Sequence, residues 1–122
     1  MQQLVGIVRN ENEMLRAVEH LRLMRSRTEN LRVTGNREYN NGWHTALDLK
    51  NLLTVSEAIT MSALDRKESR GAHFREDYPE KDEKTGKSNC IIFKNKDGRM
   101  QLKRESLGEL REDLKQIIEE MK

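Results

Sequence analysis

Residues 58–79, AITMSALDRKESRGAHFREDYP, join the end of a helical pattern to a densely charged segment. Apolar and small residues predominate as far as Leu64, and Gly71 and Pro79 then break the pattern. Basic residues followed by a glycine are typical of a helix C-terminus, where they complement the helix dipole and allow a left-handed residue. A helix end does not explain the polar cluster that follows directly: His73, Arg75, Glu76 and Asp77. This stretch is therefore the main candidate for function.

Residues 66–79, RKESRGAHFREDYP, resemble the RxESRGAHxREDYP signature of the succinate dehydrogenase/fumarate reductase flavoprotein family. Two further blocks agree with that family in order and spacing. Residues 43–53, WHTALDLKNLL, resemble its ALDLxNLL helix, and residues 5–10, VGIVRN, resemble its VGIVRN block. In the family these blocks belong to the C-terminal helical domain of the flavoprotein subunit. L-aspartate oxidase and adenylylsulfate reductase relatives share this domain, and the residues do not exclude them.

The resemblance implies an intact subunit that exchanges electrons between FAD and a succinate/fumarate pair. It implies two partners: the flavin-binding domain of the same subunit and an iron–sulfur subunit. It also implies a cytoplasmic location, with the intact complex at the cytoplasmic face of the membrane. The family's catalytic residues lie in its flavin and capping domains, so we expect no catalytic or cofactor-binding residue in this chain. Four residues are assigned to interdomain contact: Arg66, Arg70, His73 and Arg75.

A different class of function stays open from the residues themselves. Arginine and histidine in a glycine-containing loop suit bidentate binding of a dicarboxylate or a phosphate. The chain could then be a free-standing helical protein-interaction module with a basic loop. One observation argues against direct binding. Acidic residues in the same loop can form exposed ion pairs with its basic residues: Glu68, Glu76 and Asp77. We therefore favour an interdomain role, with the interaction module as the alternative.

Composition limits the other possibilities. The 122 residues suit one domain, and 36% are charged against 34% hydrophobic, with a mean hydropathy of −0.93. A net charge of +2 is weak support for nucleic-acid binding. The single cysteine, Cys90, forms no internal disulfide and suits a reducing compartment. No apolar run approaches the roughly 18 residues of a membrane span, so we expect no membrane insertion.

Metal and nucleotide sites are not expected in this chain. The three histidines, His20, His44 and His73, do not have the spacing of zinc ligands with one another or with Cys90. No GxGxxG or P-loop motif is present. We therefore expect the chain to bind neither a metal nor FAD by itself.

The apolar pattern predicts a mainly α fold, an up-and-down three-helix (spectrin-repeat-like) bundle with a small β-hairpin and a C-terminal helix. The family resemblance implies that residues 1–8 end a first helix, and the apolar spacing predicts further helices over 10–32 and 43–69. Residues 1–79 form the bundle, and residues 80–122 supply a mobile linker, a hairpin over 88–104 and a helix from Ser106, packed on the same domain. The helix over 43–69 is apolar on several faces, which predicts exposed apolar surface and self-association.

Overall fold

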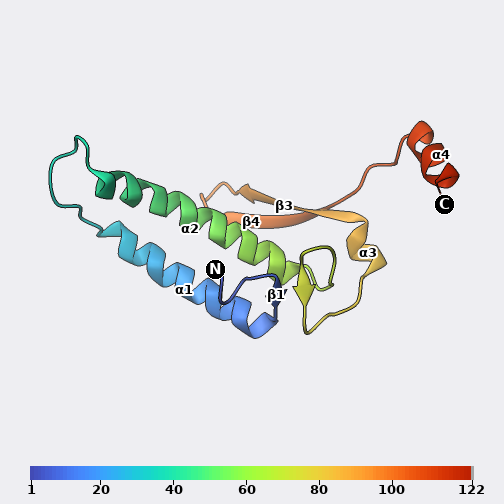
Figure 1. Ribbon diagram of the computed structural model, residues 1–122, viewed down its shortest axis with the longest axis horizontal. Helices are drawn as coiled ribbons and strands as arrows, with labels where there is room; N and C mark the ends of the chain where they lie inside the picture. Colours follow the sequence, from blue (N-terminus) through green and yellow to red (C-terminus); the bar gives the residue numbers. More distant parts are fainter. Residues whose placement is uncertain (122) are drawn as a thin grey trace.

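Two long antiparallel helices form the body of the computed structural model, which describes residues 1–121 (Figure 1). Helix α1 spans Glu11–Glu29 and helix α2 spans Asn41–Asp65. Each begins at an asparagine cap: the Asn10 side chain accepts the N–H of Glu13 at 3.0 Å, and that of Asn40 accepts the N–H of Trp43 at 3.3 Å. These caps satisfy amide groups that the first helical turn leaves without a partner.

The apolar core is small and lies where the chain start meets the beginning of α1 and the end of α2. It contains Val5, Met14, Ala17 and Ala63, and Leu4 and Leu64 pack against it. Residues 1–7 form turns rather than the predicted helix, and strand β1, Val8–Arg9, follows them. The segment contains polar residues and Gly6 as well as apolar residues. This sequence allows a turn, and the turn places Val5 in the core.

Strand β1 pairs in parallel with β2, Phe74–Arg75, in the register Val8 with Phe74 and Arg9 with Arg75. This short pair holds the segment before α1 against the loop after α2. It forms a contact between the two sequence blocks that bound the helical hairpin.

A β-hairpin lies along α2, and a short helix precedes it (Figure 1). Strands β3, Ser88–Lys94, and β4, Met100–Ser106, are antiparallel, with Ser88 opposite Ser106. The predicted mobile linker contains helix α3, Glu83–Gly86, capped by Asp82. The Arg104 side chain donates to the Asp65 carboxylate at 2.8 Å and to its carbonyl at 2.7 Å, which ties the hairpin to the end of α2.

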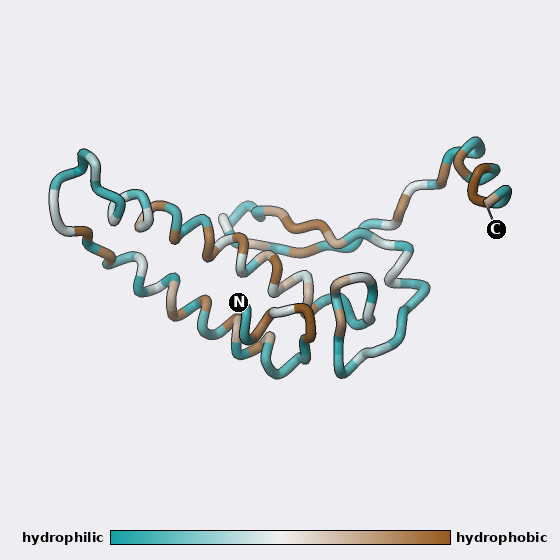
Figure 2. Tube along the Cα trace, in the orientation of Figure 1, coloured by the Kyte–Doolittle hydropathy of each residue, from teal (hydrophilic) through white to brown (hydrophobic). Residues whose placement is uncertain are grey.

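Helix α4, Glu112–Glu120, lies away from the helical hairpin at the end of an extended segment (Figures 1 and 2). Its apolar residues are at least 43% exposed: Leu114, Ile117 and Ile118. The mainly helical class with a β-hairpin and a C-terminal helix is confirmed. The packed part contains two long helices rather than three, because residues 1–7 form turns in place of the first helix. Among residues 1–121, no helix has both the length and the apolar character needed to cross a bilayer.

Candidate interdomain contact site

The loop that follows α2, residues 66–79, is folded on itself by its own hydrogen bonds. Arg70 and His73 exchange backbone bonds of 2.9 and 3.1 Å around Gly71, whose φ is +59°. A side chain at Gly71 would meet nothing within 4 Å, so the backbone angle rather than space requires the glycine. The Ser69 hydroxyl accepts the N–H of Arg75 at 2.8 Å and donates to the Tyr78 carbonyl at 2.9 Å.

Arg75 is the centre of this loop, and its side chain is completely buried. One guanidinium nitrogen, Nη1, donates to carbonyl oxygens at the end of α2: Ala63 at 3.0 Å, and Leu64 and Arg66 at 3.4 Å. These carbonyls lack partners within their own helix, and a positive charge there also complements the helix dipole. Arg75 is thus an internal cap for α2. Its side chain is enclosed within this chain, and the interdomain contact expected of Arg75 stays a prediction.

Asp77 couples Arg75 to the first turn of α1. Its two carboxylate oxygens accept Nε and Nη2 of Arg75 at 2.7 and 2.6 Å, and one of them also accepts the backbone N–H of Glu11 at 3.1 Å. The Arg75 hydrogen bonds lower the pKa of Asp77 to about 2 against the opposing effect of burial, and the Glu11 N–H acts in the same direction. This bidentate pair therefore joins the negative end of α2 to the positive end of α1.

Glu68 is the second fully buried charge in the loop. Its carboxylate accepts Nη1 of Arg66 at 2.6 Å, Nε of Arg70 at 3.2 Å and the backbone N–H of Asp82 at 2.9 Å. Burial alone raises the pKa of Glu68, but the hydrogen bonds from Arg70 and Asp82 and the two arginine charges outweigh it, and the pKa is lowered. The expectation that Glu68 forms only exposed ion pairs was wrong, because α3 and the loop enclose its carboxylate.

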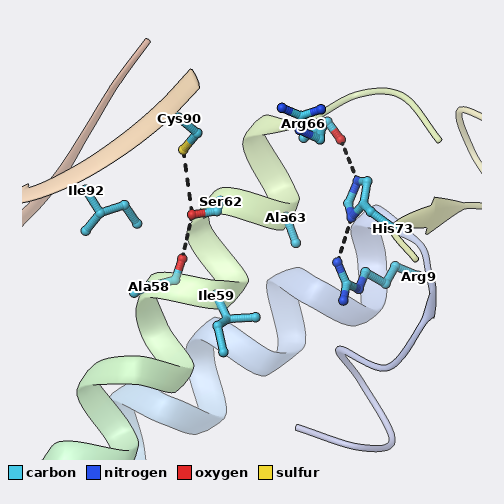
Figure 3. Close-up of a pocket in the computed structure, with 9 residues that line it drawn as sticks. All are labelled: Arg9, Ala58, Ile59, Ser62, Ala63, Arg66, His73, Cys90 and Ile92. Atoms are coloured by element: carbon cyan, nitrogen blue, oxygen red, sulfur yellow. Dashed lines mark hydrogen bonds between the residues drawn. The ribbon is translucent and has the colours of Figure 1, made fainter. Parts of the chain in front are cut away.

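His73 links Arg9 to the end of α2 (Figure 3). Its Nδ1 lies 2.6 Å from Nη1 of Arg9, and its Nε2 lies 3.1 Å from the Arg66 carbonyl. A guanidinium only donates and a carbonyl only accepts, so the imidazole is neutral with its proton on Nε2. Burial lowers the pKa of His73, and the charges of Arg9, Arg75 and Arg66 add to this effect, although the Arg66 carbonyl opposes it.

A shallow, open depression of about 460 Å³ lies beside His73, between α2 and the β-hairpin (Figure 3). Its edge includes Arg9, Arg66 and His73. The rest of its surface is mostly apolar or small, formed by Ala58, Ile59, Ser62, Ala63, Cys90 and Ile92. The Cys90 thiol points to the Ser62 hydroxyl at 3.6 Å.

The structure separates the four predicted contact residues into different surroundings. Arg66 and His73 line the depression, Arg70 lies over Glu68 with 37% of its side chain exposed, and Arg75 is internal. Arg9 also belongs to the edge, and sequence reasoning missed it. The VGIVRN block contains Arg9, but only the β1–β2 pairing brings it to residues that lie 64 positions further along the chain.

The N-termini of the two long helices do not fit an FAD pyrophosphate. Dinucleotide sites place phosphate at a helix N-terminus, beside glycines that let the backbone approach. The first amides of α1 and α2 are already bonded to side-chain oxygens of Asn10 and Asn40, and the Asp77 carboxylate also occupies the α1 end. A phosphate at α1 would meet that negative charge. The expectations that this chain binds neither FAD nor a metal by itself stay predictions.

Comparison with known proteins identifies the family to which this helical hairpin, its closing loop and the β-hairpin belong. The family model described as fumarate reductase flavoprotein C-term matches residues 1–120, and the chain belongs to that family. The resemblance read from the signature is thereby confirmed, and the alternative of a free-standing interaction module is not favoured.

Similar proteins agree with this assignment. The chain is 41% identical over 88 residues to an uncharacterized FAD-dependent oxidoreductase of Methanocaldococcus jannaschii, covering 72% of this chain and 15% of that protein. It is 37% identical over 91 residues to the succinate dehydrogenase flavoprotein subunit of Coxiella burnetii, covering 74% of this chain and 16% of the subunit. Mycobacterium smegmatis Sdh1 in complex with UQ1 superposes with a TM-score of 0.86 at 36% identity, covering 98% of this chain and 20% of that chain. The chain thus spans a small part of its relatives' length.

Proposed function

We propose that the chain is the docking domain of an FAD-dependent flavoprotein subunit of the succinate dehydrogenase/fumarate reductase type. In this proposal the intact subunit exchanges electrons between FAD and a succinate/fumarate pair. The flavin-binding domain holds the FAD, and an iron–sulfur subunit is the electron partner. The names of the relatives support this, since they include flavoprotein subunits of succinate dehydrogenase and fumarate reductase.

The observation that carries the docking role is an exposed apolar stripe on α2. Leu52, Val55 and Ile59 are 62%, 57% and 44% exposed. Their spacing of three and four residues places them on one helical face. A contiguous exposed apolar surface marks an interaction site more often than isolated apolar residues do. The stripe ends at the depression that Ile59 lines, beside Arg66 and His73.

The proposed contact surface therefore combines this stripe with the exposed part of the loop. Arg66 and Arg70 retain 26% and 37% of their side-chain exposure, and His73 lines the open depression. Internal bonds of Arg75 and Glu68 hold the loop in one conformation before docking, so little ordering entropy is lost on contact. The chain's role is to cover and position the flavin-binding domain, while the redox chemistry belongs to FAD and to residues outside this chain.

A chimera tests the proposal. Residues 1–122 replace the matching segment of Mycobacterium smegmatis Sdh1, and flavin content and fumarate reduction by a reduced dye are measured. We expect the chimera to retain FAD and activity, and Sdh1 without the segment to lose both. Ile59→Glu should weaken flavin retention, because it places a charge within the apolar contact. Lys50→Glu, on the other flank of α2, is the matched control and should have little effect. A folded chimera without flavin would contradict the proposal.

A further inference from the structure

Arg9 differs from the other arginines near the end of α2 because it has no carboxylate partner among residues 1–121. Arg66 and Arg70 pair with Glu68, Arg75 pairs with Asp77 and at 3.6 Å with Glu11, and Arg104 pairs with Asp65. Arg9 instead donates to the neutral imidazole of His73 and, through Nε, to the carbonyl of Gly6. Its guanidinium is half-buried, and burial lowers the pKa of Arg9. A partly desolvated charge without a counter-charge is unfavourable.

The depression beside Arg9 is suited to one negative group next to an apolar one. Arg9 and Arg66 are its charged lining residues, and no described carboxylate lines it. The remaining surface includes Ile59, Ala63 and Ile92, which favour an apolar neighbour. Figure 3 shows Arg9 and Arg66 on either side of the His73 ring, with the apolar residues extending toward the β-hairpin.

We propose that Arg9 receives the carboxylate of an aspartate or glutamate on the flavin-binding domain, and that an apolar residue beside that acid covers the depression. The inference rests on the proposed function and deepens it, because it names the chemistry at the centre of the docking surface. His73 positions the cation: its Nδ1 accepts from Nη1, which fixes the guanidinium at the edge while other N–H groups of Arg9 stay available.

Charge counting favours a side-chain carboxylate over a free dicarboxylate. Arg66 is already bonded to Glu68 at 2.6 Å, so Arg9 is the cation of the depression that lacks a described anion. A free dicarboxylate would carry a second charge onto the apolar surface around Ile59 and Ile92. Burying that charge without a partner is costly. A single acid on a protein segment presents one charge, and its neighbours supply the apolar contact.

Arginine footprinting tests the inference without any substitution. The isolated 122-residue chain and the flavin-loaded Sdh1 chimera are treated with phenylglyoxal, and modification rates are read by peptide mass spectrometry. We expect Arg9 to react at least tenfold more slowly in the chimera. Arg32, at the other end of the helical hairpin, is the internal control and should react equally in both proteins. A parallel sample of the isolated chain with succinate reports on a free dicarboxylate.

A second measurement identifies the acid. In the chimera with Arg9→Lys, a zero-length carbodiimide should join position 9 to an aspartate or glutamate of the flavin-binding domain. The matched Arg32→Lys chimera should form no cross-link to that acid.

The outcomes separate the two proposals. A chimera without bound flavin contradicts the proposed function and this inference with it. A flavin-loaded chimera in which Arg9 stays as reactive as in the isolated chain overturns the inference alone. Protection of Arg9 by succinate in the isolated chain also overturns it, because a free dicarboxylate would then be the ligand.

Discussion

The loop after α2 and helix α4 depart in opposite directions from the usual link between polarity and exposure. The loop is one of the most charged parts of the chain, yet Glu68 and Arg75 within it are fully buried. Helix α4 has a regular apolar stripe, yet Leu114 and Ile117 are 43% and 48% exposed. Charges are stable inside this domain because each has bidentate or multiple partners, whereas an apolar stripe is buried only where a second surface meets it.

The largest effect should follow from Arg75→Ala. The substitution removes the Arg75 donor from the Asp77 carboxylate and from the carbonyls at the end of α2, and breaking a buried ion pair costs about 3–5 kcal/mol. We expect that loss in the free energy of unfolding of the isolated chain, measured by urea denaturation. Arg32→Ala is the control, and as an exposed substitution it should change the value by less than about 0.5 kcal/mol. Equal stability of the two variants would show that the loop does not support this domain.

Glu68→Gln should have a smaller effect of the same kind. The amide keeps the shape and one acceptor, but the charge-assisted bonds from Arg66 and Arg70 are lost. A hydrogen bond to a charged group contributes about 1.5–3 kcal/mol, and because the amide oxygen still accepts one arginine N–H, we expect a total loss near the value for a single bond. Urea denaturation again measures it, with Glu38→Gln in the exposed helix connection as the control. No loss at position 68 would contradict the buried-network account.

Stability should fall on acidification, with His73 acting first. Its pKa is lowered in the folded state, so below the ordinary value of 6.5 the unfolded chain takes up a proton that the folded chain resists. Asp77 contributes a further loss below its ordinary value of 3.8, toward its folded pKa of about 2. Melting temperatures between pH 8 and 5 should decline in the native chain and in His20→Gln, and decline less in His73→Gln. A native chain with a flat profile would exclude this effect.

The smallest effect should come from α4. Ile117→Ala should change the free energy of unfolding by less than about 0.5 kcal/mol, since its side chain lies half exposed. The matched core change, Met14→Ala, should cost about 2–5 kcal/mol because Met14 is completely buried. Sedimentation should show less self-association for Ile117→Ala than for the native chain. A large stability loss would mean that α4 packs on this domain in solution.

Sequence reasoning predicted the local features of the fold. Helical periodicity identified both long helices, and the β-hairpin was expected over 88–104. It failed where distant segments determine structure. The family resemblance implied a helix ending at residue 8, but residues 1–7 form turns and Val8 pairs with Phe74. For α4, the sequence shows an amphipathic helix but not which surface it meets.

For the candidate site, too, the sequence predicted the local grouping of residues but not the contacts between distant segments. The signature identified Arg66, Arg70, His73 and Arg75 as a group, but not which of them is exposed. Burial of Arg75 depends on carbonyls at the end of α2 and on Asp77, and placement of Arg9 beside His73 depends on β1. These contacts form only when the segment before α1 meets the loop after α2. Residue types and their spacing do not predict that meeting.

Native-state hydrogen exchange tests the central claim, that the charged loop is part of this domain's own folded core. The amides of Arg75 and Glu76 donate to Ser69 Oγ at 2.8 Å and to the Arg9 carbonyl at 2.9 Å, inside the network. We predict that they exchange only through global unfolding, at the slow rates of the buried turns of α1 and α2. The amides of α4 should exchange far faster, through local opening. Exchange of Arg75 and Glu76 as fast as that of α4 would contradict the account.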